Sequence, residues 1–173
     1  IVVVALLFRR VHREALAVAS LAALLFAVED AHAMNVGWLA NRHALITVVT
    51  GGLAFLAHVR WRESEGLRWV GAALIALGAG LLSGEAALGA SAWIVAWQVC
   101  MDKGRWARRL AALAPYVVLV VFWRLVYDHL GYGIRGSDLY IDPRHEPGAF
   151  AFAMMERWPQ LMLGQWLQVP IDA

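Results

Sequence analysis

Residues 69–101, WVGAALIALGAGLLSGEAALGASAWIVAWQVCM, decide the fold class of this chain. They hold a single charged residue, Glu85, close to their centre. As one helix this stretch would be about 50 Å long, which exceeds the roughly 30 Å hydrocarbon core of a membrane. The Ser83–Glu85 tripeptide instead favours a tight turn. We therefore predict two apolar helices, 69–83 and 86–101, joined as a hairpin.

The rest of the sequence has the same character. Of its 173 residues 61% are apolar and 16% are charged, whereas an ordinary soluble domain is about half apolar and a quarter charged. A soluble core of this size could not bury so many leucine, alanine and valine side chains. Further apolar runs predict helices at about 1–8, 15–29, 44–59 and 110–128. The predicted fold is an all-α polytopic transmembrane bundle of five spans plus part of a sixth.

Both ends of the sequence fall inside predicted elements. Ile1 lies in an apolar run without a leader, and the last residues end in mid-loop. We expect one membrane-embedded domain over 1–173 that is truncated at both ends. The tail, 129–173, begins as a polar loop and continues as FAFAMMERWPQLMLGQWL, where we expect short interfacial helices broken at Pro159.

Basic residues alternate between the two sides of the predicted bundle. The short segments 9–14, 60–68 and 102–109 hold 10 of the 15 Lys and Arg residues, whereas the alternate regions hold nine of the 13 acidic residues. The positive-inside rule then places these three segments in the cytoplasm and the regions 29–43 and 129–173 on the outer face. The expected location is the inner membrane of a bacterium, with membrane lipid as a partner.

Several classes of function are excluded by residue content. The single cysteine, Cys100, rules out a disulfide framework and a multi-cysteine metal site. The sequence contains no P-loop, dinucleotide-binding fingerprint, zinc signature or Ser-His-Asp order. Its basic residues are too dispersed for a nucleic-acid partner. No cofactor is evident.

Polar residues at outer helix ends are the candidate site, because charge near lipid is costly unless it meets water or a partner. Glu29 and Asp30 end the second helix, and His32 follows. If the helix continues, Glu29 and His32 share a face and could act as a general base or as half of a divalent-cation site. A solvated loop end has the same composition, and too few ligands are visible to predict a metal site.

Two further candidates lie at the starts of predicted helices. Arg42 could grip a phosphate with both arms of its guanidinium, or pair with Glu29 or Asp30. Glu85, in the hairpin turn, must face water, a cation or a ligand. Both are candidate substrate-binding residues.

The end of the last predicted helix and the tail supply the remaining candidates. Arg124 forms either a local ion pair with Asp128 or a phosphate contact. Tyr140, Asp142 and Arg144 lie in a polar loop suited to recognition of sugar or phosphate.

Three segments together resemble the GT-C type of membrane glycosyltransferase. HAMNVGWLANRHALI (32–46) resembles the family's helix start with His and Arg, and LLSGEAAL (81–88) resembles its L-S-K-E-x-A hairpin. LGYGIRGSDLYIDPRHEPGAF (130–150), with ERWPQLMLGQWL after it, resembles the outer loop of the family. The pattern is most similar to protein O-mannosyltransferase-like members, including those that carry tetratricopeptide repeats.

The resemblance implies transfer of a sugar from a polyprenyl-phosphate donor to an acceptor on the non-cytoplasmic face. His32 and Arg42 match the first motif, and Ser83 and Glu85 match the second. Two positions depart from the pattern: Gly84 stands where the family has Lys, and Met34 where it has an acid. The resemblance also places the catalytic acid in a loop before Ile1. A carrier or flippase, or a non-catalytic membrane scaffold, remains an alternative from the residues alone.

Overall fold

The computed structural model describes residues 1–12, 15–29, 36–38, 41–64, 66–132, 141–143 and 145–167. These residues form seven α-helices and one 3-10 turn, and they contain no strand, which confirms the all-α class. The chain divides into two compact units, Ile1–Leu125 and Val126–Ala173.

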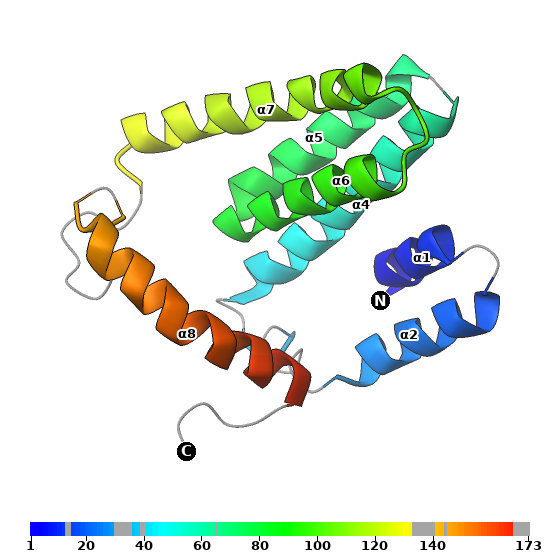
Figure 1. Cartoon of the computed structure of the whole chain (residues 1–173). Coiled ribbons are helices and arrows are strands. Elements are labelled where there is room, and N and C mark those ends of the chain that lie inside the picture. Colours follow the sequence, from blue (N-terminus) through cyan, green and yellow to red (C-terminus); the bar gives the residue numbers. More distant parts are fainter. Residues whose placement is uncertain are drawn as a thin grey trace. The chain divides into compact units, whose positions relative to one another are not determined.

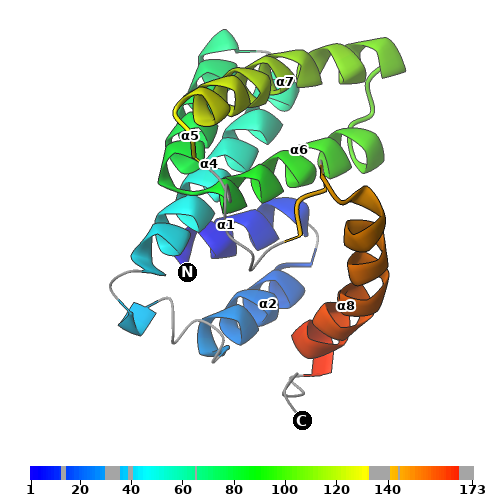
Figure 2. The ribbon, with the colours of Figure 1, turned by 90° about the vertical axis from the view of Figure 1, so that its left-hand side faces the viewer.

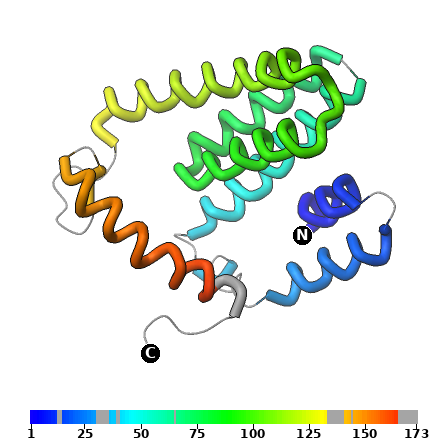
Figure 3. Tube along the Cα trace, viewed as in Figure 1, coloured from blue at the N-terminus to red at the C-terminus, as the bar shows by residue number. Residues whose placement is uncertain are grey.

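The first unit contains a group of packed helices. Helices α1 (Val2–Val11) and α2 (Leu16–Val28) pair at the N-terminus, as the tube in Figure 3 shows. Helix α4 (Arg42–Ser64) packs against α5 (Leu67–Ser83) and against α6 (Leu88–Cys100) (Figure 1). The turned view in Figure 2 shows α1 beside α4. Most of α7 (Trp106–His129) also belongs to this unit.

The predicted hairpin is confirmed. Helix α5 ends at Ser83, the 3-10 turn η3 occupies Glu85–Ala87, and α6 follows at once. Small residues let the helices approach closely. A Cβ added to Gly51 of α4 would lie 2.9 Å from the Cβ of Ala90, and one added to Gly80 would lie 2.8 Å from the hydroxyl oxygen of Thr50. Such close packing fixes how the helix ends meet.

Helices extend beyond the apolar runs that predicted them. The run 44–59 belongs to a helix that continues to Ser64, because the arginines of its last turns remain at the surface or form ion pairs and need not end it. Among the described residues, two helices, α4 and α7, are long and apolar enough to cross a membrane. The shorter α2 and α5 are also apolar.

The second unit contains one long helix, α8 (Pro147–Leu167). The predicted break at Pro159 is wrong, because the helix continues through this residue. Proline removes one backbone donor, but Met and Leu residues on both sides favour the helical conformation, and the missing bond alone does not end it. Pro115 is tolerated inside α7 in the same way.

Candidate functional site

The structure brings the start of α4 and the α5–α6 turn, two of the segments with candidate site residues, close together. A Cβ added to Gly84 in the α5–α6 turn would lie 3.2 Å from Cδ2 of His43 and 3.5 Å from Oγ1 of Thr47, both on the first turns of α4. Arg42, the first residue of α4, and Glu85, the first of η3, are exposed at this same end. We call this group of residues, 42–47 and 83–85, the turn site.

Thr47 is the unusual member of the turn site. Its side chain is buried, and its hydroxyl oxygen has no hydrogen-bond partner among the described residues. By contrast, the Thr50 hydroxyl donates to the carbonyl of Ile46 (2.8 Å) and the Ser83 hydroxyl donates to the carbonyl of Ala79 (2.9 Å). A buried hydroxyl that makes no bond costs free energy. Thr47 therefore carries an unused donor and acceptor beside Gly84.

The end of α5 is also tied to α7. The indole N–H of Trp123 donates to the carbonyl of Leu81 (3.1 Å). Arg124 follows in sequence and is exposed. The hydrogen bond therefore holds the segment of α7 that carries Arg124 near the end of α5.

The other predicted residues are not brought to the turn site by any described contact. Glu29 is the exposed residue that follows the end of α2 at Val28. Asp142 belongs to the second unit, where its Oδ2 is hydrogen-bonded to Nδ1 of the exposed His145 (2.8 Å). Asp30, His32, Tyr140 and Arg144 fall outside the described residues. Within the part of the chain that is described, no three His, Cys, Asp or Glu side chains gather as a metal site would require.

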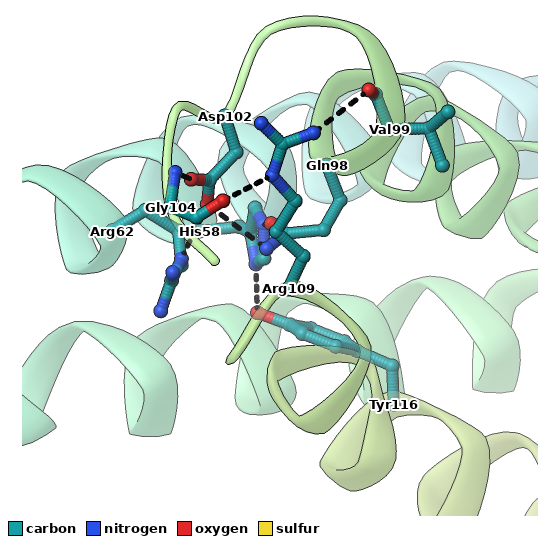
Figure 4. Close-up of polar contacts among 8 residues, drawn as sticks. All are labelled: His58, Arg62, Gln98, Val99, Asp102, Gly104, Arg109 and Tyr116. Carbon is teal, nitrogen blue, oxygen red and sulfur yellow. Dashed lines mark hydrogen bonds and ion pairs between the residues drawn. The ribbon is translucent and has the colours of Figure 1, made fainter. Parts of the chain in front are cut away.

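A second polar cluster lies at the opposite end of α4, and Figure 4 shows its bonds. His58 is completely buried; its Nδ1 lies 2.9 Å from the hydroxyl of Tyr116 and its Nε2 lies 2.8 Å from Oε1 of Gln98. The amide nitrogen of Gln98 donates to Oδ2 of Asp102 (2.9 Å). We call these four residues the His58 chain. It links α4, α6, α7 and the loop between α6 and α7.

Asp102 anchors the His58 chain. The Nε–H of Arg62 donates to its Oδ2 (2.8 Å), and the backbone N–H of Gly104 donates to its Oδ1 (2.6 Å). Burial alone would raise the pKa of the Asp102 carboxyl, but the hydrogen bonds from Gly104, Arg62 and Gln98 outweigh burial and lower that pKa below its ordinary value. Asp102 is therefore an anion at neutral pH.

The charge on Asp102 sets the direction of every bond in the chain. An ionised carboxylate only accepts, so the atom of Gln98 that faces it must be the amide nitrogen, and the Gln98 oxygen faces His58. His58 must then carry its proton on Nε2, which leaves Nδ1 to accept from the hydroxyl of Tyr116. A neutral imidazole satisfies both bonds. The His58 chain is fully paired.

Two tryptophan rings contact His58, and a further arginine holds the loop that carries Asp102. The rings of Trp61 and Trp97 meet His58 edge-on, with centroids 5.8 and 5.6 Å away. Arg109 donates to the carbonyls of Gly104 (2.8 Å) and Val99 (3.2 Å), which holds the loop after α6 in place.

The three basic segments meet at this end of the unit. An ion pair between Arg10 and Glu63 joins the end of α1 to the end of α4. The Arg62–Asp102 pair joins the end of α4 to the loop before α7. The segments that the distribution of Lys and Arg assigned to one side therefore lie together.

Sequence reasoning missed the His58 chain, since it treated residues 44–59, 86–101 and 110–128 as uniformly apolar. One signal was present: Gln98 and Asp102 are spaced i, i+4, and polar side chains inside apolar helices seek partners. The spacing does not identify His58 or Tyr116 as those partners.

No protein-family model matches the chain, and neither a curated protein nor a solved structure is detectably similar to it.

Proposed function

We propose that this chain belongs to a multi-spanning membrane protein that transfers a sugar from a polyprenyl-phosphate donor, and that the turn site binds the donor on the non-cytoplasmic face. The observation that carries the proposal is the contact of Gly84 with His43 and Thr47. Two segments forty residues apart, chosen from sequence for their resemblance to one family, meet at one end of the helices.

Membrane placement is supported by the distribution of polarity. On α7 the side chains of Val118, Phe122 and Leu125 are 67%, 64% and 65% exposed, while the polar His58 and Gln98 are buried inside the unit. In water the apolar groups would be expected inside and the polar groups outside. Lipid as the surrounding solvent accounts for this reversal.

The turn site has groups suited to a phosphate-linked sugar. The guanidinium of Arg42 can donate two parallel hydrogen bonds to phosphate oxygens, and it would stabilise the charge that develops as the phosphate leaves. The carboxylate of Glu85 can accept from sugar hydroxyls. In the reaction, an acceptor oxygen bonds to the anomeric carbon, the bond from that carbon to the phosphate breaks, and a base takes the acceptor proton. The turn site is proposed to bind the donor and not to supply that base.

The test uses the full-length protein in its membranes with a panel of radiolabelled polyprenyl-phosphate hexoses. Wild-type protein is expected to transfer label from one donor to an acceptor. R42A and E85Q should each reduce transfer at least about tenfold, the loss expected for one charged contact to a reacting phosphate or sugar. R157Q, an arginine of the second unit, is the matched control and should transfer normally. Wild-type rates in both R42A and E85Q, or no transfer from any donor, would overturn the proposal.

The His58 chain favours a second candidate, a carrier for an anionic or polyprenyl-linked solute. A carrier needs polar groups at depth in the membrane. His58 lies six residues before the end of α4, which is about 9 Å along the helix. Proteoliposomes that contain a fluorescent polyprenyl phosphate would test this. A carrier should move this lipid between leaflets, and the H58F variant should lose that activity. A transferase should not move the lipid.

A further inference from the structure

Two arginines share one tryptophan at the end of the unit that holds the His58 chain. The guanidinium carbons of Arg60 and Arg68 lie 5.6 and 5.4 Å from the centroid of the Trp69 ring. The ring packs against the hydrophobic core, and a Cβ added to Gly66 would lie 3.3 Å from its Cδ1. Trp69 is thus closely packed, and both guanidinium groups lie against its ring. We call Arg60, Arg68 and Trp69 the Trp69 patch.

Both arginines of the patch are exposed. Two acids at the end of α4 and in the loop after α6 are engaged elsewhere, since Glu63 pairs with Arg10 and Asp102 pairs with Arg62. Glu65 falls outside the described residues.

More exposed positive charge lies in the loop after α6, which the Arg62–Asp102 pair joins to the end of α4. Lys103, Arg105 and Arg108 are exposed in the loop after α6 and in the first turn of α7, and no carboxylate among the described residues forms an ion pair with them. This part of the surface therefore has a strong attraction for anions.

We propose that the Trp69 patch binds the phosphate group of an anionic phospholipid in the leaflet at this end. Guanidinium groups match phosphate oxygens with paired hydrogen bonds, and their cation–π contacts with Trp69 reduce the freedom lost on binding. Tryptophan prefers the depth of lipid headgroups, and clustered basic residues beside a span attract acidic lipids. The proposal rests on the membrane placement in the proposed function and is independent of sugar transfer.

The experiment compares full-length protein in nanodiscs of pure phosphatidylcholine with nanodiscs that contain 30% phosphatidylglycerol. Wild-type Tm should rise by about 4 °C or more with phosphatidylglycerol. In R60Q/R68Q most of that rise should disappear, while R157Q, which removes an exposed arginine of the second unit, should keep it. The single variants R60Q and R68Q, each losing part of the rise, serve if the double variant does not fold.

Three outcomes would overturn the proposal. The rise could be absent in wild type, it could persist unchanged in R60Q/R68Q, or millimolar inorganic phosphate could produce the same rise in pure phosphatidylcholine. The last result would assign the patch to free phosphate. Because sugar transfer is measured separately, failure of the glycosyltransferase proposal leaves this test unaffected.

Discussion

The two ends of α4 use polar residues in opposite ways. At the turn site, Arg42 and Glu85 are exposed and the buried Thr47 hydroxyl makes no hydrogen bond among the described residues. In the His58 chain, both ring nitrogens of the histidine are bonded and the run ends on the anchored carboxylate of Asp102.

This contrast separates what holds the helices from what could bind a ligand. A fully paired buried network stabilises one arrangement of the helices. The buried Thr47 hydroxyl of the turn site, which makes no hydrogen bond among the described residues, retains bonding capacity. Variants of the His58 chain should therefore change stability first, and variants of the turn site should change activity first.

The largest expected effect is the loss of the Asp102 carboxylate. In D102A the guanidinium of Arg62, the amide of Gln98 and the N–H of Gly104 lose their common acceptor, which should cost about 3 kcal/mol of unfolding free energy. E85A, which removes a solvent-exposed carboxylate of the turn site, should cost much less, because exposed charges contribute little to stability. Denaturant titration of both variants in one detergent measures the contrast. Equal losses of unfolding free energy in D102A and E85A would show that the two ends of α4 do not differ in how they stabilise the helices.

A smaller loss is expected from the middle of the His58 chain. H58L should cost about 2 kcal/mol, because the Tyr116 hydroxyl and the Gln98 oxygen stay buried without partners. Replacing the partners as well, in H58L/Q98L/Y116F, should recover part of that loss, since no unpaired polar group would remain at those positions. Thermal unfolding of the single and triple variants checks this. A triple variant that is far less stable than H58L would show that the loss in H58L does not come from unpaired polar groups.

Much of the helical framework follows from the sequence. The apolar run 69–101 with its central Ser83–Glu85 predicted the hairpin, and the structure has the turn there. The clustering of Lys and Arg predicted which loops share a side, and the Arg62–Asp102 pair joins two of them. The hairpin prediction succeeds because it depends on local composition.

The pairing of distant polar residues does not follow from the sequence in the same way. His58 and Tyr116 are 58 residues apart, and each has mostly apolar neighbours in its own helix. Periodicity gives the face of a helix but not its neighbour, and here close approach at Gly51 and Gly80 helps to decide which faces meet. The proximity of Gly84 to His43 also depends on how the helices pack. The resemblance suggested that their segments share a site, but it did not identify which residues meet.

A modest effect on stability and a larger one on activity are expected for Gly84. The added methyl of G84A would lie 3.2 Å from His43 and must displace it by a few tenths of an ångström. Unfolding free energy should fall by less than about 1 kcal/mol, while sugar transfer should fall several-fold because the two motif segments separate. G78A is the matched control, since its methyl would meet only Leu119, at 4.0 Å, and alanine favours the helix. If sugar transfer is unchanged in G84A, the turn site has no role in the reaction.

The smallest expected effect is a pH dependence of stability that comes from Asp102 in the His58 chain. The pKa of Asp102 is lower in the folded protein than in the unfolded chain, so the folded state binds its proton less readily. Its contribution to stability is therefore complete above the unfolded pKa, near 4, and is lost as the pH falls through the lower folded value. Between pH 6 and pH 3 the difference in Tm between wild type and D102N should shrink, since D102N has no proton to gain at this position. A constant difference across that range would mean that the hydrogen bonds from Gly104, Arg62 and Gln98 do not favour the ionised carboxylate, and the direction assigned to the whole His58 chain would then be wrong.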